Sequence, residues 1–314
     1  MKRALRIGLG VVIALMVVAG VALFYLGRML ATFATTIPPA ARPNLTPASL
    51  GLPFKEWETA SEDGIRLSAW WVPAAPGVPE REPVIVIHGL GASKEFMLSY
   101  ISLIHADGRP ALAIDLRGHG ESEPGPTTLG AREPLDVKAW AALLRSQGHP
   151  HPVLWGTSLG AMTALRAAAA NPDIGGVIAD APFDTLRHTM AVHARLFFGL
   201  PEYPFVPLTV WEVERSLHFK VADVDGYRAV AALKCPLLLL AAENDRRMSL
   251  DSIQALYAAA HEPKRFYLIR GEDHERRRFP PDFRAEVTGF LDSCDGGQIP
   301  APVPANGETS AAAR

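Results

Sequence analysis

The chain has 314 residues, of which 48% are apolar and 20% are charged. This composition is typical of a folded globular protein and excludes a disordered or collagen-like chain. Of the 31 Lys and Arg residues, five lie in residues 1–54, where no acidic residue occurs, so residues 55–314 hold 26 basic and 33 acidic residues, a net charge of −7. A segment with this net negative charge is poorly suited to binding the phosphate backbone of a nucleic acid, so we expect no nucleic-acid partner.

A long apolar run follows the basic N-terminus. Residues 7–27 contain no charged side chain, and a helix of this length would span about 30 Å, the thickness of the hydrocarbon core of a bilayer. A core helix is rarely apolar on every face, and a signal peptide usually has a shorter apolar region. We therefore interpret residues 1–30 as an uncleaved membrane anchor with a transmembrane helix over about residues 7–27. A cleaved signal peptide is the alternative.

The flanks of this run predict its orientation and its connection to the rest of the chain. Lys2, Arg3 and Arg6 precede it, and only Arg28 and Arg42 follow it. The positive-inside rule therefore places the N-terminus in the cytoplasm and the body of the protein on the extracytoplasmic side. Five prolines within residues 31–55 predict an extended spacer that lifts the body off the membrane, and the Gly-, Pro- and Ala-rich composition of residues 293–314 predicts a disordered tail.

Between residues 56 and 292, short apolar runs bounded by Pro or Gly alternate with longer stretches of helical spacing. The predicted strands cover residues 57–60, 66–72, 84–87, 111–114, 153–155, 176–179, 237–241 and 265–269, and the predicted helices cover residues 94–106, 133–147, 159–170, 250–260 and 281–292. The first two strands flank Glu62-Asp63-Gly64 and form an antiparallel hairpin. The pattern predicts an α/β fold, with a mainly parallel eight-stranded sheet covered by helices on both faces.

The regular alternation stops between about residues 183 and 230. This segment carries aromatic residues among prolines and charges, and it lies between two predicted strands. We interpret it as a cap insertion over the carboxyl ends of the sheet. Its aromatic side chains either line an acyl pocket or seal the cap onto the sheet.

A serine lies between two glycines where a predicted strand meets a helix. The strand over residues 153–155 continues into Gly156-Thr157-Ser158-Leu159-Gly160 and then into an Ala-rich stretch. G-x-S-x-G in this context is typical of a nucleophile elbow, in which larger side chains at the flanking positions would collide with neighbouring backbone. The pattern predicts Ser158 as a nucleophile.

A serine hydroxyl needs a base, and the base needs an acid to orient it. In this kind of fold the acid and then the histidine follow the serine along the chain, each just after a strand. Asp245 follows the predicted strand over residues 237–241, and His274 follows that over residues 265–269. We therefore predict Asp245 as the acid and His274 as the base. Glu243 and Asp180 are rival acids.

Acyl transfer also requires backbone donors for the oxyanion. The residue after the nucleophile, Leu159, supplies one N–H. The second is expected in the loop after the strand over residues 84–87, which reads His88-Gly89-Leu90-Gly91-Ala92, and we assign it to Leu90. His88 is interpreted as a structural residue that ties this loop together.

These residues, together with the stretch Asp115-Leu116-Arg117-Gly118-His119-Gly120-Glu121-Ser122, resemble the α/β-hydrolase superfamily. The sequence is most similar to its serine aminopeptidase-like and monoglyceride-lipase-like branch. In that branch the D-x-R-G-x-G-x-S stretch shapes a loop near the site and is not catalytic. The resemblance covers about residues 56–292 and implies a serine hydrolase. It departs at Ala242, where a glycine is common, and in the charged run around His274.

No other motif predicts a cofactor or a metal. The chain has no phosphate-binding loop, its two cysteines lack metal-ligand spacing, and His188 and His193 lack the spacing of zinc ligands and are interpreted as surface residues. We expect a membrane-anchored, esterase-like serine hydrolase that cleaves a carboxylic ester, thioester or amide of a small-molecule or lipid-like acyl substrate through an acyl-enzyme. An acyltransferase with the same triad, a peptidase and a non-catalytic binding protein on this fold are the alternatives.

Overall fold

A computed structural model describes residues 2–38, 43–274 and 279–295. Residues 296–314, which make up most of the predicted tail, lie outside the described residues. The same holds for part of the predicted spacer, residues 39–42, and for the run Glu275-Arg276-Arg277-Arg278 that follows the predicted base.

The centre of the fold is a twisted eight-stranded sheet with the order β1-β2-β4-β3-β5-β6-β7-β8. The strands are β1 (Lys55–Ala60), β2 (Arg66–Val72), β3 (Val84–Ile87), β4 (Ala111–Ile114), β5 (Val153–Thr157), β6 (Gly176–Asp180), β7 (Leu237–Ala242) and β8 (Lys264–Ile269). The β1–β2 hairpin is antiparallel, β2 also pairs antiparallel with β4, and all other neighbours are parallel. The predicted mainly parallel sheet of eight strands is confirmed.

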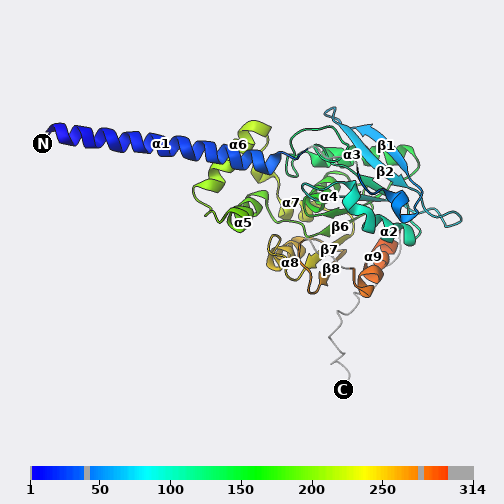
Figure 1. The fold of residues 1–314 in the computed structure, drawn as a ribbon. Helices are drawn as coiled ribbons and strands as arrows, with labels where there is room; N and C mark the ends of the chain where they lie inside the picture. Colours follow the sequence, from blue (N-terminus) through cyan, green and yellow to red (C-terminus); the bar gives the residue numbers. More distant parts are fainter. Residues whose placement is uncertain (1, 39–42, 275–278, 296–314) are drawn as a thin grey trace, which may run out of the picture.

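Helices cover both faces of this sheet, and a long helix leaves it at the N-terminus (Figure 1). The helices are α1 (Lys2–Thr35), α2 (Leu98–Ala106), α3 (Glu133–Ser146), α4 (Leu159–Ala170), α5 (Leu186–Phe198), α6 (Phe205–Leu217), α7 (Gly226–Ala232), α8 (Leu250–Ala259) and α9 (Pro281–Cys294), with short 3₁₀ turns η1 (Pro47–Leu50), η2 (Lys94–Met97) and η3 (Val221–Asp223).

The alternation of side chains along the strands produces two hydrophobic cores. On β3, Ile85 and Ile87 point into the core formed with α3, α4, α7 and α8, whereas Val84 and Val86 point into the core formed with α2 and α9. Because β3 is buried on both faces, its sequence is an unbroken apolar run and not an alternating one. The sheet is thereby held rigidly, and the ends of its strands can position side chains accurately.

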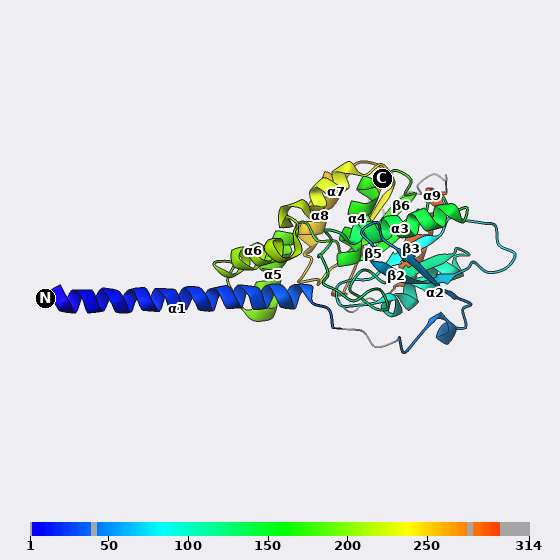
Figure 2. The same cartoon turned by 90° about the horizontal axis from the view of Figure 1, so that it is seen from above.

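The cap insertion consists of α5, α6, η3 and the start of α7. Its two ends are held together by an isolated bridge between Thr185 and Asp225 and by a hydrogen bond from the Gly226 N–H to the Asp184 carbonyl at 2.6 Å. In both views α5 and α6 lie beside the second half of α1, while the first half of α1 extends away from the rest of the molecule (Figures 1 and 2).

Helix α1 is longer than the sequence predicts. Its segment Leu5–Thr35 is long and apolar enough to cross a membrane. The helix does not stop near Gly27 but continues to Thr35, so the prediction of an extended spacer is wrong for residues 31–35. The physical reason is that the first proline of the spacer is Pro38 and that α6 packs along this part of α1.

Candidate active site

Ser158 lies in a strained turn between β5 and α4. Its backbone has a φ of 53° and a ψ of −114°, a conformation that residues other than glycine rarely adopt. A Cβ atom at Gly156 would collide with the Gly160 carbonyl, and one at Gly160 would collide with the Ile87 carbonyl. Both flanking glycines are therefore required for this turn, as the sequence predicts.

The structure brings the three predicted catalytic side chains together. The Ser158 Oγ lies 3.2 Å from the His274 Nε2, and the His274 Nδ1 lies 2.7 Å from the Asp245 Oδ2. The serine comes from the β5–α4 turn, while Asp245 and His274 come from the segments after β7 and β8. Because these strands are parallel, their carboxyl ends meet at one edge of the sheet, where the three residues form a chain of hydrogen bonds.

The surroundings of Asp245 keep it ionised. Burial favours its protonated form, but the hydrogen bond with His274, the charge of His274 and the backbone N–H groups of Met248 and Arg247 outweigh burial and lower the pKa of Asp245. Both amides donate to the second carboxylate oxygen, Oδ1, at 2.9 Å. One oxygen is thus fixed by backbone and the other faces the imidazole.

The two rival acids occupy other places. Glu243 is exposed and accepts a hydrogen bond from the Gly271 N–H at 2.8 Å. Asp180 is buried at the end of β6, where its backbone carbonyl accepts a hydrogen bond from the Ser158 N–H at 2.8 Å. The carboxylate that accepts from the imidazole of His274 is that of Asp245.

The two predicted oxyanion donors lie beside the serine. Leu159 is the first residue of α4, and a Cβ atom at Gly89, next to Leu90, would lie 3.4 Å from the Ser158 Cβ. Within the described part of the chain, no hydrogen bond uses the backbone N–H of Leu90 or Leu159. The assignment of both amides as oxyanion donors stays a prediction, and it requires N–H groups that are not used in this way.

Two buried histidines fix the loop that carries Leu90. The His88 Nε2 accepts a hydrogen bond from the Leu116 N–H at 3.1 Å, while its Nδ1–H donates to the Gly89 carbonyl at 2.7 Å. Burial lowers the pKa of His88 to about 4, so its ring is neutral and can both donate and accept. The His119 Nε2 accepts from the Gly91 N–H at 3.2 Å. These bonds agree with a structural role for His88.

Ser158 and His274 line a cavity of about 730 Å³. Its walls come from the loop after β3, from the cap helices α5 and α6 and, unexpectedly, from Leu30, Phe33 and Ala34 at the end of α1. The lining is mostly aliphatic and aromatic. The volume lies in the range of small-molecule binding sites in proteins.

The comparison with known proteins agrees with this architecture. The family model described as alpha/beta hydrolase fold matches residues 82–268. The chain belongs to the alpha/beta hydrolase fold family. A solved structure of the Pyrococcus furiosus esterase Pf2001 is 27% identical, with a TM-score of 0.69, and the likeness covers 82% of this chain and 98% of that one.

Among the curated relatives, the uncharacterized protein Rv2307c of Mycobacterium tuberculosis is 26% identical over 84% of this chain and 86% of its own length. The esterase Rv0045c of the same organism is 36% identical over 30% of each chain. Together with the esterase structures, these relatives establish this chain as a hydrolase-type, esterase-like enzyme.

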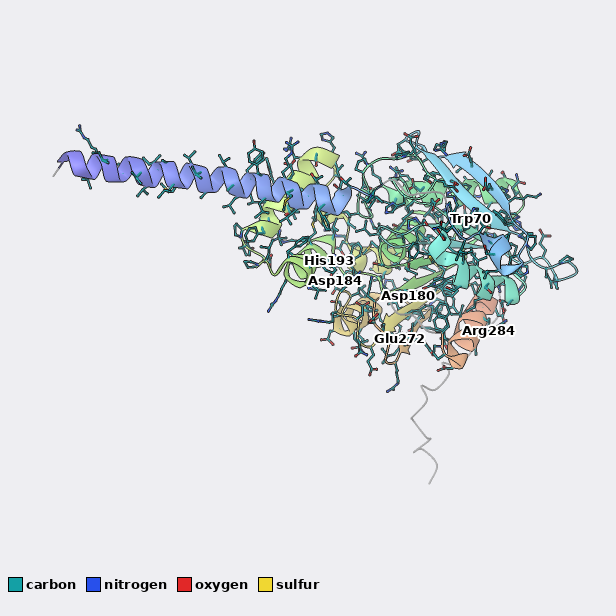
Figure 3. All side chains as sticks on the ribbon, in the orientation of Figure 1. Trp70, Asp180, Asp184, His193, Glu272 and Arg284 are labelled. Atoms are coloured by element: carbon teal, nitrogen blue, oxygen red, sulfur yellow. The ribbon has the colours of Figure 1, made fainter. Side chains whose placement is uncertain are left out.

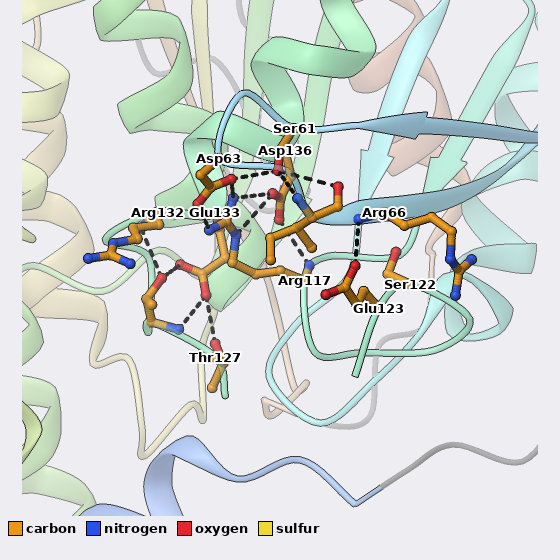
Figure 4. Close-up of polar contacts among 12 residues, drawn as sticks. Ser61, Asp63, Arg66, Arg117, Ser122, Glu123, Thr127, Arg132, Glu133 and Asp136 are labelled. Carbon is orange, nitrogen blue, oxygen red and sulfur yellow. Dashed lines mark hydrogen bonds and ion pairs between the residues drawn. The ribbon is translucent and has the colours of Figure 1, made fainter. Parts of the chain in front are cut away.

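The D-x-R-G-x-G-x-S stretch of this hydrolase follows β4 and is held by buried charges. Arg117 forms ion pairs with Asp63 of the β1–β2 turn and with Asp136 of α3, each at 2.6 Å (Figure 4). Asp115 forms an ion pair at 2.8 Å with the buried Nζ of Lys94, a residue that the sequence reasoning did not single out. A Cβ atom at Gly120 would collide with the Asp115 carboxylate. The motif therefore braces the loop that carries Leu90 together with the β1–β2 turn and α3.

Two further site features escaped the sequence reasoning. His193 was predicted to lie on the surface, but this residue of α5 (labelled in Figure 3) lines the cavity, where burial and the charge of Arg247 lower its pKa to about 4. Leu30 falls at the end of the predicted anchor, and Phe33 and Ala34 fall at the start of the predicted spacer. No local pattern marks either feature, since both depend on how the cap and α1 pack together. Within the described residues, no group of three or more His, Cys, Asp or Glu side chains is arranged to hold a metal ion.

Proposed function

We propose that this protein is a membrane-anchored serine hydrolase that cleaves a carboxylic ester, thioester or amide through an acyl-enzyme intermediate. The observation that carries the proposal is the hydrogen-bonded chain from Asp245 through His274 to Ser158, with separations of 2.7 and 3.2 Å, in the wall of a mostly apolar cavity. The esterases of Pyrococcus furiosus and Mycobacterium tuberculosis to which the chain is similar favour an ester as the substrate.

In this mechanism the His274 Nε2 removes the proton from the Ser158 Oγ as the oxygen attacks the substrate carbonyl carbon. The amides of Leu90 and Leu159 stabilise the negative charge that develops on the carbonyl oxygen. The Asp245 carboxylate orients the imidazole and stabilises its cationic form. His274 then gives its proton to the leaving group, and water hydrolyses the acyl-enzyme by the same steps with His274 again as the base.

Ser158→Ala tests the nucleophile. We expect loss of labelling by a fluorophosphonate probe and a fall in ester hydrolysis of at least about 10⁴-fold, because the attacking oxygen is removed. Ser99→Ala is the matched control, since Ser99 also lines the cavity but lies outside the hydrogen-bonded chain. Persistent labelling of the Ser158→Ala protein would contradict the proposal.

The membrane orientation is part of the same proposal. Lys2, Arg3 and Arg6 before the apolar segment, against Arg28 and Arg42 after it, favour a cytoplasmic N-terminus and an extracytoplasmic hydrolase domain. A C-terminal alkaline phosphatase fusion, which is active only outside the cytoplasm, should be active, and a C-terminal green fluorescent protein fusion should be dark when exported through the general secretory route. The reverse pattern would overturn the orientation.

A further inference from the structure

The second half of α1 is built into the hydrolase domain. Its Gly27 lies so close to α6 that a Cβ atom there would be 3.0 Å from the Leu208 Cβ. Three residues earlier, Phe24 contacts the ring of Trp211, with 6.0 Å between ring centroids. At its end, the Thr35 carbonyl accepts a hydrogen bond from the Thr127 N–H at 3.0 Å. The end of the helix is therefore fixed on both the cap and the loop before α3.

This fixed part of α1 also forms a wall of the cavity that contains Ser158. Leu30, Phe33 and Ala34 line the cavity. The Phe33 ring packs edge to face against Phe198 at the end of α5, with 5.4 Å between centroids. Helix α1 and the cap thus contribute to the same side of the cavity, where Phe33 and Phe198 contact each other.

The mouth of the cavity is apolar. Several large lining residues keep much of their surface exposed: Phe33 and Phe96 70% each, Phe197 48%, Phe198 44% and Leu90 43%. Contiguous exposed apolar surface of this kind marks ligand grooves and membrane-facing sites. Among the described residues that line the cavity there is no Asp or Glu, and the one Lys or Arg is Arg247, whose guanidinium lies over the Phe197 ring. The aliphatic and aromatic side chains that make up most of the walls suit an extended apolar group.

We propose that the end of α1 is a substrate-binding element, in which Phe33 and Ala34 form the part of the pocket that accepts a long alkyl acyl chain. The inference rests on the proposed function, because it assigns the acyl group that Ser158 attacks to this pocket. The helix that anchors the protein thereby also selects its substrate. Long-chain acyl esters gain affinity from burial along Leu30, Phe33 and Phe198, whereas short-chain esters do not reach this wall.

Two substitutions in the full-length protein test the inference from opposite directions. Phe33→Ala removes the wall, and Ala34→Phe fills the space beside it. In each variant we expect the ratio of kcat/KM for p-nitrophenyl dodecanoate to kcat/KM for p-nitrophenyl butyrate to fall about tenfold, which corresponds to about 1.4 kcal/mol. Each ratio is compared with that of the wild type in the same detergent micelles, so that partitioning of the ester cancels.

Met29→Ala is the matched control. Met29 lies about one turn before Phe33 on α1 and is 58% exposed, but it is not among the residues that line the cavity. The Met29→Ala protein should have the same ratio of dodecanoate to butyrate kcat/KM as the wild type. Unchanged ratios in both Phe33→Ala and Ala34→Phe, with butyrate hydrolysis and fluorophosphonate labelling intact, would overturn the inference and leave the proposed function standing. Failure of the wild type to hydrolyse any ester or to label at Ser158 would instead contradict the proposed function.

Discussion

Residues 5–22 of α1 are exposed along their whole length, whereas in residues 27–35 of the same helix Gly27, Leu30, Ala31 and Thr35 are buried. Both halves are apolar, and neither contains an acidic residue. The buried residues recur at helical spacing, so that they lie on one face, which α6 and the loop before α3 cover. The difference teaches that apolar composition alone does not distinguish an exposed segment from one that packs against protein.

The lengths of the two halves support separate roles. At about 1.5 Å per residue, residues 5–22 span about 27 Å, close to the thickness of a hydrocarbon core. The exposed aromatics Phe24 and Tyr25, together with Trp211 of the cap, begin where this half ends. Aromatic residues favour the interface between lipid and water. In the proposed membrane-anchored enzyme, the cap therefore lies at the bilayer surface, and no long spacer separates the pocket from it.

Glycines give the sharpest test of this comparison, because the exposed half contains Gly8, Gly10 and Gly20 and the buried half contains Gly27. Gly27→Leu should destabilise the domain by about 1–3 kcal/mol, since the new side chain must displace Leu208, and it should lower dodecanoate hydrolysis more than butyrate hydrolysis. Gly20→Leu meets nothing within 4 Å and should not destabilise the domain. Thermal unfolding followed by tryptophan fluorescence in detergent measures both effects.

Both substitutions replace glycine by the same residue within the same helix, so the change in helix propensity is shared and cancels in the comparison. Equal stabilities of the Gly27→Leu and Gly20→Leu proteins would contradict the tight packing of α1 on α6. Equal losses of long- and short-chain hydrolysis in Gly27→Leu would contradict the role of this half of α1 in the acyl pocket.

The sequence predicted the central strands well because they are buried on both faces, whereas β1 at the edge of the sheet is not. Runs such as Val84–Ile87 and Leu237–Ala242 are apolar without interruption, and Pro or Gly bounds them. Ser158 could be placed in its turn because the strained backbone requires glycine on both sides. Asp245 and His274 could be proposed as its partners only from their order along the chain and their positions after strands, and Glu243 shares such a position.

The pocket wall could not be predicted from sequence for a physical reason. Whether Phe33 faces lipid, water or Phe198 depends on where α6 packs, and Gly27 is one small residue among several in an apolar run. The same reason applies to His193, which lines the cavity because of where α5 packs. Contacts between segments far apart in sequence leave no periodic signal in either one.

The pH dependence of the free energy of unfolding tests whether Gly27→Leu acts locally or loosens the whole domain. Of the effects predicted here, we expect this one to be the smallest. Burial lowers the pKa of His88 from 6.5 to about 4. Between these pH values the unfolded chain binds a proton that the folded chain does not, so this residue makes stability fall as the pH decreases, by at most about 1.4 kcal/mol per pH unit. His88→Gln, which keeps a donor and an acceptor but cannot titrate, should reduce this slope in urea unfolding between pH 6.5 and 4. Gly27→Leu should keep the wild-type slope, and a flattened slope in that variant would mean that the surroundings of His88 had also opened.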